Sequence, residues 1–236
     1  MRLALTKYGL PQVVIFPAIV LAAMVIALLA WPKSLSVWGI ISVETIFAVV
    51  LVWILSFFRD PERLVPAEKN LLLSPADGRI TDIEIVEEKD FIGGTALRIG
   101  IFLGIFNAHI NRAPCDVKVE RITYKKGKYK NAMNPESGRV NESNDLGLIR
   151  TDSPNDRLIV RQISGAVARR IVCETRQGQE LTGGEKFGMI KFGSRTELYV
   201  PAPQGPAREG VKCLVKIGDK VKAGLSPVVR YEKCPD

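Results

Sequence analysis

Two long apolar runs occupy the N-terminal part of the chain. Residues 10–31 carry no charged side chain, and residues 34–58 carry only Glu44. Because a carboxyl group within a membrane is unfavourable, a hairpin that enters the membrane only partly is an alternative to one that spans it. A helix of about 22 residues is ~33 Å long, which matches a hydrocarbon core of ~30 Å. The linker at 32–34 is too short for a domain. We therefore expect residues 1–58 to form a hydrophobic helical hairpin that anchors the chain in a membrane.

Positive charges flank this hairpin. Arg2 and Lys7 precede the first run. Arg59 and Arg63 follow the second run, whereas the turn holds Lys33 alone. Because Lys and Arg are retained on the cytoplasmic side, we expect both ends of the hairpin and the rest of the chain on the cytoplasmic side of the cell membrane.

From residue 71 onward, short apolar runs alternate with Gly, Pro, Asn and Asp turns. Period-two alternation is typical of strands, and we find no long amphipathic helix here. The clearest runs are 78–86, 95–103, 115–124, 157–163 and 166–174. The pattern predicts a mainly β fold, α+β at most, with residues 59–70 as a juxtamembrane linker and residues 71–236 as the β domain.

One segment refines the fold prediction. Residues 215–228 read as strand, turn, strand, turn, with Gly218 and Gly224 at the turns. This cadence resembles the barrel-sandwich β folds of biotinyl and lipoyl domains. The segment 74–80 predicts a matching turn that leads into the first strand. We therefore expect a barrel-sandwich-like β domain.

The chain is basic, with a net charge of +8 and a pI near 9.4, which favours anionic partners. One stretch gathers many of these charges around two tyrosines. Its basic residues are Arg121, Lys125, Lys126, Lys128 and Lys130. A solvated hairpin tip is one interpretation. Contact with anionic lipid is the other, at ~1 kcal/mol per basic residue near the surface. The two apolar runs favour an anionic membrane surface over nucleic acid.

The cysteines do not suggest a metal site. Cys115, Cys173, Cys213 and Cys234 form no CxxC pair, and the chain holds 1 histidine. We expect reduced thiols in mostly buried positions. No structural metal is predicted.

Three turn-rich segments each hold one reactive side chain: Asp77 in SPADGRI, His109 in FNAHINRAP and Ser194 in KFGSRTELYVP. A carboxylate, an imidazole and a hydroxyl are the groups that activate a serine. Ser194 does not stand in a G-x-S-x-G elbow, so an ordinary serine hydrolase is disfavoured. The preceding Gly193 leaves room for the hydroxyl to attack its own preceding carbonyl.

These motifs resemble those of the short bacterial and archaeal phosphatidylserine decarboxylase proenzymes, and they occur in the same order. The matching motifs are FFRDPER, SPADGRI, FNAHINRAP, AVARRI and GEKFGMIKFGSRTELYVP. The resemblance covers essentially the whole chain, including the hydrophobic hairpin.

The resemblance implies a zymogen that cuts itself between Gly193 and Ser194. Ser194 attacks the Gly193 carbonyl to form an ester, elimination gives dehydroalanine, and hydrolysis releases ammonia and leaves a pyruvoyl group. The products are a beta chain, 1–193, and an alpha chain, 194–236. They are expected to stay together as a heterodimer, alone or within a higher oligomer.

The pyruvoyl group derived from Ser194 is then the cofactor, and neither a metal nor pyridoxal phosphate is needed. Its ketone forms a Schiff base with the serine amine of a phospholipid substrate and accepts the electron pair as carbon dioxide leaves. The expected reaction converts phosphatidylserine to phosphatidylethanolamine.

The resemblance also assigns roles. Asp77 orients His109, and His109 deprotonates Ser194 during self-cleavage and later helps to protonate the product. Longer family members carry a second histidine where this chain has Arg112. We hypothesise that Arg112 or Arg195 binds the substrate carboxylate or phosphate.

Three alternatives stay open. The same chemistry fits archaetidylserine, whose ether-linked lipid carries the same headgroup. A biotinyl or lipoyl carrier would use Lys191 as the acceptor lysine, although no methionine follows it and the carrier gives Asp77 and His109 no role. A non-enzymatic, membrane-anchored β adaptor explains the apolar runs and the charge, and it predicts an intact chain.

Overall fold

A computed structural model of the chain describes residues 4–32, 34–134, 136–166, 170–191, 193–202 and 210–231. Arg2, Lys33, Cys234 and the middle of the AVARRI motif lie outside the described residues. The chain divides into two compact units, 1–61 and 62–236. The division falls within the segment 59–70 that the sequence suggests as a linker.

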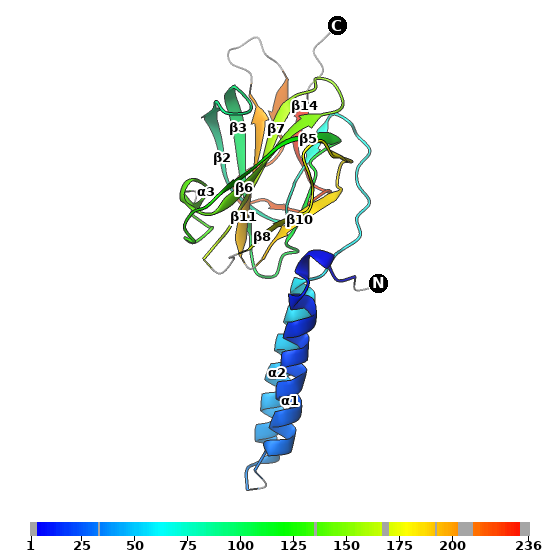
Figure 1. Ribbon diagram of the computed structural model, residues 1–236, viewed down its shortest axis with the longest axis vertical. Coiled ribbons are helices and arrows are strands. Elements are labelled where there is room, and N and C mark those ends of the chain that lie inside the picture. The colour runs from blue at the N-terminus through cyan, green and yellow to red at the C-terminus, as the bar shows by residue number, and fades with distance from the viewer. Residues whose placement is uncertain are drawn as a thin grey trace. The chain divides into compact units, whose positions relative to one another are not determined.

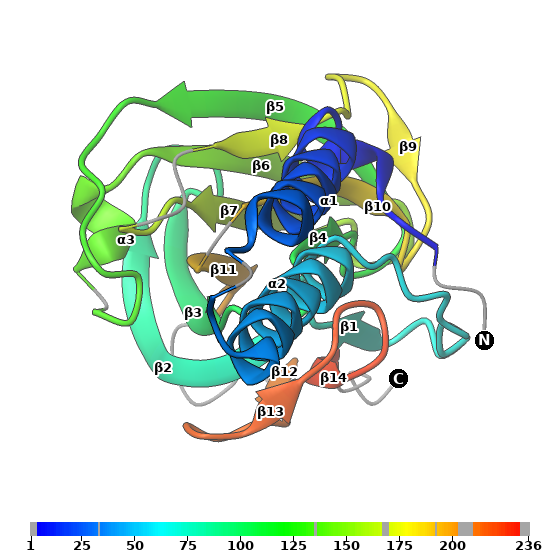
Figure 2. The same ribbon diagram turned by 90° about the horizontal axis from the view of Figure 1, so that it is seen from below.

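The first unit is a pair of apolar helices, α1 (Gln12–Ala30) and α2 (Val37–Phe57), which run side by side in opposite directions (Figures 1 and 2). They are 19 and 21 residues long, enough by length and composition to cross a membrane. The Ser36 hydroxyl caps α2 by accepting a hydrogen bond from the Trp38 N–H at 3.2 Å. The predicted helical hairpin is confirmed.

The two ends of the hairpin are fastened to each other. The Thr6 N–H donates to the Phe58 carbonyl at 2.9 Å, and the Asp60 N–H donates to the Ala4 carbonyl at 2.7 Å. These bonds surround the short 3-10 turn η1 (Lys7–Gly9). Both ends of the pair therefore lie together, as a hairpin requires.

Strands are the main regular structure of the second unit, and its described helix, α3 (Ser137–Val140), is a single turn. The strands are β1 (Leu71–Leu73), β2 (Gly78–Glu88), β3 (Gly94–Leu103), β4 (Ile110–Arg112), β5 (Val117–Lys125), β6 (Ser143–Arg150), β7 (Arg157–Ile163), β8 (Ile171–Cys173), β9 (Glu180–Leu181), β10 (Lys186–Ile190), β11 (Ser194–Pro201), β12 (Val211–Cys213), β13 (Lys220–Val221) and β14 (Pro227–Tyr231). The prediction of a mainly β domain is confirmed.

The strands form one large antiparallel sheet and two small ones. The large sheet has the order β13-β2-β3-β11-β7-β6-β5-β9, and the small sheets have the orders β1-β14-β12 and β4-β10-β8. Figure 2 shows the large sheet curling, with β5, β6, β7, β11, β3 and β2 following one another around the curve. Strand β11 thus lies inside the sheet, between β3 and β7.

The concave side of the curl is filled by apolar side chains. Ile99, Ile101 and Leu103 of β3 and Leu146 and Leu148 of β6 are fully buried members of one core cluster. Each buried side chain of this size contributes about 1.5–3 kcal/mol relative to an exposed one. This core fixes the register of the central strands.

The register brings four loops to one end of the large sheet. Ser194 pairs with Leu103, Arg195 pairs with Ile163, and Ile163 also pairs with Ser143. The loops that continue beyond these positions lie in 104–109, 126–142, 164–170 and 191–193, as far as the structure describes these ranges. We call this region the Ser194 end of the sheet.

Candidate active site

Ser194 is the first residue of β11 and is completely buried. Its hydroxyl oxygen makes no hydrogen bond with any described residue. A buried hydroxyl without a partner costs about 1–3 kcal/mol, so such groups are uncommon and tend to mark functional positions. The free lone pairs of Ser194 Oγ suit a nucleophile.

Gly193 precedes it with a backbone conformation that favours glycine. Its φ is +67°, in the left-handed region, and among the described residues other than its chain neighbours no atom lies within 4 Å of the position that a β-carbon would take. The Gly193 N–H points at His109 Nε2, at a distance of 3.3 Å. The only histidine of the sequence therefore lies at the dipeptide that the sequence analysis singled out.

The hydrogen bonds of His109 indicate which nitrogen carries the proton. His109 Nδ1 lies 2.9 Å from the Asn107 carbonyl oxygen, which can only accept, so Nδ1 is the donor. His109 Nε2 accepts from Gly193 and is then the basic nitrogen. The ring is completely buried, so its orientation is set by these contacts and by packing.

A tight turn places this histidine. The Asn107 side chain accepts from the Gly104 N–H at 2.8 Å, and the Asn107 N–H donates to the Gly104 carbonyl at 2.9 Å. Downstream, the Ile190 N–H donates to the His109 carbonyl at 3.2 Å. Asn107 is therefore the residue that shapes the loop and faces the imidazole, and sequence reasoning did not single it out.

Asp77 lies in the turn before β2 and is paired with Arg63. The two guanidinium nitrogens of Arg63 donate to the two carboxylate oxygens of Asp77 at 2.6 and 2.8 Å. The Ala223 N–H also donates to Asp77, at 2.8 Å, and Arg63 donates to the Ala223 carbonyl. The orienting role that the resemblance gave to Asp77 toward His109 stays a prediction, since the described partners of this carboxylate are Arg63 and Ala223.

Arg195 follows Ser194 but is completely buried. Its guanidinium donates to Asp82 at 2.7 and 2.6 Å, to Glu197 at 2.8 Å and to Thr81 at 2.8 Å. Burial alone lowers the pKa of Arg195, but the Glu197 and Asp82 carboxylates outweigh it and the net pKa is raised. These contacts favour a structural role, and the suggested substrate contact stays a prediction.

Arg112 is also buried, in β4. Its Nη1 donates to the Gly184 carbonyl at 3.0 Å, and its backbone N–H donates to the Pro75 carbonyl at 3.0 Å. Arg112 thus joins the turn that contains Asp77 to the segment before β10. A substrate contact for Arg112 stays a prediction as well.

Lys191 lies two residues before Gly193, and only 3% of its surface is exposed. Burial lowers the pKa of Lys191, and the charge of Arg170 lowers it further. The Lys191 N–H donates to the Arg170 carbonyl at 3.2 Å. A buried lysine of this kind does not suit the acceptor role of a biotinyl or lipoyl carrier, whose lysine must reach other active sites.

The Ser194 end of the sheet is basic and partly apolar. Ile105 and Phe106 are 48% and 74% exposed in the loop before His109, and Met133 is 58% exposed in the loop before α3. The exposed basic residues described in these loops are Lys126, Lys128, Lys130, Arg139 and Arg170, and Glu136 is an exposed acidic residue among them. Exposed apolar groups among cations are typical of surfaces that contact anionic lipid.

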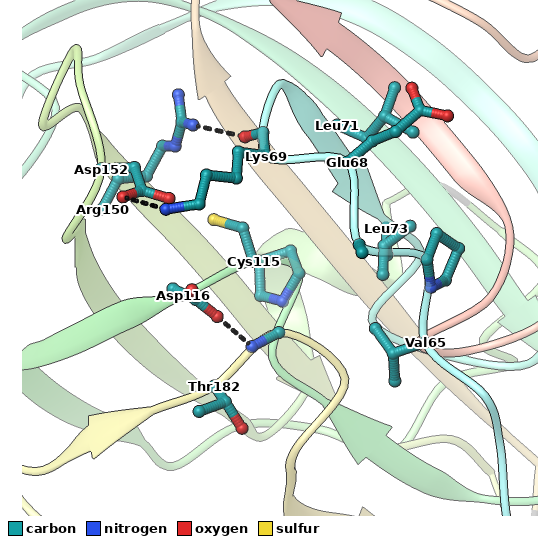
Figure 3. A pocket seen from close by; sticks show the side chains of 14 residues that line it. Val65, Glu68, Lys69, Leu71, Leu73, Cys115, Asp116, Arg150, Asp152 and Thr182 are labelled. Carbon is teal, nitrogen blue, oxygen red and sulfur yellow. Dashed lines mark hydrogen bonds and ion pairs between the residues drawn. The ribbon is translucent and has the colours of Figure 1, made fainter.

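A pocket of about 260 Å³ lies elsewhere in the same unit, under residues 65–69 (Figure 3). Its charged groups serve contacts inside the protein: Lys69 pairs with Asp152 at 3.4 Å, and Arg150 donates to the Lys69 carbonyl at 3.1 Å. Neither Ser194 nor His109 lines it. We therefore assign it no part in the chemistry.

The site thus places the Ser194 hydroxyl directly after a glycine whose N–H faces the imidazole of His109. In the part of the chain that the structure describes, no group of three or more His, Cys, Asp and Glu side chains lies together as metal ligands.

Comparisons with known proteins agree with these motifs. The family model described as phosphatidylserine decarboxylase matches residues 50–228. A phosphatidylserine decarboxylase proenzyme of Rhodopirellula baltica is 39% identical over 231 residues, which cover 98% of this chain and 90% of the relative. Proenzymes of the same name from Desulfotalea psychrophila and Symbiobacterium thermophilum are 41% and 42% identical, covering 76% and 82% of this chain and 79% and 84% of the relatives. The chain therefore belongs to the phosphatidylserine decarboxylase family.

Proposed function

We propose that this chain is a proenzyme that cuts itself between Gly193 and Ser194 and then converts phosphatidylserine to phosphatidylethanolamine. One observation carries the proposal: the buried hydroxyl of Ser194 has no partner among the described residues and directly follows a left-handed glycine whose N–H faces His109 Nε2. A nucleophile, a base and a carbonyl whose own residue carries no side chain are the parts that self-cleavage needs.

The first step moves one acyl group. His109 Nε2 takes the proton of Ser194 Oγ, the oxygen attacks the Gly193 carbonyl carbon, and the C–N bond of the peptide breaks. The proton passes to the Ser194 nitrogen, so the products are an ester and a free amine. Loss of the Ser194 α-proton then expels the Gly193 carboxylate from the β-carbon. Addition of water and loss of ammonia leave a pyruvoyl group on residues 194–236.

In decarboxylation the pyruvoyl carbonyl supplies an electrophile for the substrate amine and a sink for the electron pair that carbon dioxide leaves behind. His109 would hold and return the proton that the product carbon requires. Ser194 and His109 are completely buried, and electrostatic contacts are stronger at a buried site than in bulk water.

The two cleavage products should remain one molecule. The alpha chain would contribute β11, which pairs with β3 on one side and β7 on the other, and it would also contribute β14. Leu198 and Val200 of β11 and Val228 and Val229 of β14 are fully buried in the core. Separation would expose this surface, so a heterodimer is the stable product.

The helix pair and the basic Ser194 end support action at the cell membrane on a phospholipid headgroup, with the β domain on the cytoplasmic side. Ester-linked and ether-linked lipids present the same phosphoserine, and the proposed chemistry applies to both. A turnover assay tests the proposal: the detergent-purified full chain is given phosphatidylserine in mixed micelles, and carbon dioxide and phosphatidylethanolamine are measured. We expect turnover by the wild type and none by Ser194→Ala. A wild type that is cut but converts no phosphatidylserine would contradict the proposed substrate.

A further inference from the structure

A second glycine, Gly165, lies against the bond that is proposed to break. A β-carbon built on Gly165 would overlap the Gly193 carbonyl oxygen, and it would lie 3.1 Å from the Gly193 carbonyl carbon. The same β-carbon would lie 3.3 Å from the Ala132 side chain. The bare α-carbon of Gly165 therefore occupies the space next to the scissile carbonyl.

The register explains this contact. Ile163 of β7 pairs with Arg195 of β11 in an antiparallel ladder. Two steps further along each strand, Gly165 stands opposite Gly193. The left-handed φ of Gly193 ends the regular ladder there, and its carbonyl turns toward Gly165. The sheet thus sets two glycines face to face at the proposed cleavage site.

The segment that carries Gly165 is fixed from the other side. The Ser164 N–H donates to the Glu142 carbonyl at 2.9 Å, and the side chain of Asn141 donates to the Ser164 carbonyl at 2.8 Å. Asn141 is completely buried and is itself held by Lys130, through bonds of 2.9 and 2.8 Å to its backbone. Gly165 cannot retreat without breaking these bonds.

We infer that Gly165 is a positioning residue for self-cleavage, whose bare α-carbon holds the Gly193 carbonyl where Ser194 Oγ attacks it. The inference rests on the self-cleavage proposed above. A methyl group at residue 165 would displace the carbonyl. Misplacement of a reacting atom by about 1 Å costs on the order of 100-fold in rate, so the ester should form at least that much more slowly.

The test compares Gly165→Ala with Gly94→Ala in the full chain. Gly94 is a matched control because, its chain neighbours apart, no atom of the described chain lies within 4 Å of its built β-carbon. The fraction of cut chain is followed on denaturing gels after synthesis, with and without hydroxylamine, which cleaves an ester but not a peptide bond. Folding is checked by melting each variant in the uncut Ser194→Ala background.

We expect the wild type and Gly94→Ala to be cut, and folded Gly165→Ala to stay whole even in hydroxylamine. Cutting of Gly165→Ala at the wild-type rate would overturn the inference. Release of residues 1–193 from Gly165→Ala by hydroxylamine alone would also overturn it, because the ester would then have formed and the block would lie later. An uncut wild type would instead contradict the proposed self-cleavage, and the inference about Gly165 would fall with it.

Asn141→Asp keeps the inference testable if Gly165→Ala does not fold. This change keeps the acceptor for the Lys130 N–H but removes the two donor bonds to the Lys130 and Ser164 carbonyls. It loosens the Gly165 segment without filling space. Slower cutting of a folded Asn141→Asp chain supports the inference, and cutting at the wild-type rate contradicts it.

Discussion

At the scale of single residues, the direction of the His109 ring decides what it can do. The Asn107 carbonyl holds the proton on Nδ1, which leaves Nε2 as an acceptor beside Gly193. A histidine held as this tautomer can take a proton from a hydroxyl without first losing one. The alternative tautomer would present an N–H to the site and could not act as the base.

His109→Ala should therefore slow self-cleavage by about 100-fold to 10,000-fold, the usual contribution of a positioned general base. The measurement is the fraction of chain cut over time after synthesis. Ser194→Ala serves as the control that cannot be cut at all. Cutting of a folded His109→Ala chain at the wild-type rate would exclude His109 as the base.

Cys115 allows a prediction about pH. Burial raises the pKa of the Cys115 thiol from 9.0 to about 12. At pH 8 the folded thiol is therefore ionised roughly a thousandth as often as the same thiol in the unfolded chain, and it should react with iodoacetamide correspondingly more slowly. Mass mapping of alkylated peptides, in native buffer and in urea, measures this ratio.

The raised pKa of Cys115 also determines how its contribution to folding stability changes with pH. Between pH 9.0 and about 12 the unfolded thiol loses its proton while the folded thiol keeps it. The unfolded state then binds fewer protons, so the contribution of Cys115 to stability is complete below pH 9.0 and is lost as pH rises toward 12. Equal alkylation rates in native buffer and in urea would contradict the buried placement.

At the scale of elements, the Arg63–Asp77 pair joins three segments that are far apart in the sequence. Arg63 belongs to the segment before β1, Asp77 to the turn before β2, and Ala223 to the turn between β13 and β14. Both partners of the ion pair are nearly buried, with side chains 6% and 11% exposed. A buried ion pair stabilises the fold by less than the removal of one partner destabilises it, because the remaining charge is then buried without a counter-charge.

Arg63→Ala should lower the free energy of unfolding by about 3–5 kcal/mol, since it leaves the Asp77 carboxylate buried without its partner. The double variant Arg63→Ala/Asp77→Asn should recover part of this loss. The coupling energy comes from urea unfolding of four proteins in the Ser194→Ala background: the parent, Arg63→Ala, Asp77→Asn and the double variant. Strictly additive effects would show that the pair does not act as a unit.

Some strands could be predicted from the sequence and others could not, and the difference has physical reasons. Strand β7 was predicted at its observed bounds and β2 and β3 nearly so, because they combine apolar residues, turns and alternation. Strand β6 was missed because its residues are buried on both faces, which removes the alternation, and it begins with polar side chains. Strand β8 is shorter than the run 166–174, of which residues 167–169 lie outside the described part.

The sequence pointed to Ser194, Gly193 and His109 through the joint context of their motifs, and the structure places the Gly193 N–H 3.3 Å from His109 Nε2. Their chemical roles stay predictions, and the supporting contacts were not predictable. The contact between Gly165 and Gly193 depends on the register of β7 and β11, which local patterns do not reveal. Arg195 looked available beside Ser194, but period two sends neighbouring side chains to opposite faces, where buried carboxylates surround it.

At the scale of the whole molecule, charge is distributed unevenly along the β domain. The loops of the Ser194 end carry several exposed lysines, whereas the turns at the other end of the sheet, 89–93 and 151–156, hold three aspartates, Asp90, Asp152 and Asp156, and one exposed lysine, Lys89. Each basic residue near an anionic surface contributes ~1 kcal/mol to binding. This asymmetry would turn the Ser194 end toward the headgroups that contain the substrate.

Lys126→Ala, Lys128→Ala and Lys130→Ala together should weaken turnover on vesicles rich in anionic lipid by about tenfold or more at low salt. The effect should shrink at high salt, where such charges are screened. The control removes three exposed lysines outside the Ser194 end: Lys69, Lys89 and Lys118. Equal losses in both triple variants would contradict a specific orientation toward the membrane.

The central claim is that the chain is a proenzyme whose Ser194 becomes the catalytic group. The intact mass of the purified protein under denaturing conditions, beside that of Ser194→Ala, tests it most directly. The account predicts two fragments, 1–193 and 194–236, the second with a pyruvoyl group in place of Ser194, and a single whole chain in the variant. A single uncut chain in a folded wild-type preparation would contradict the account.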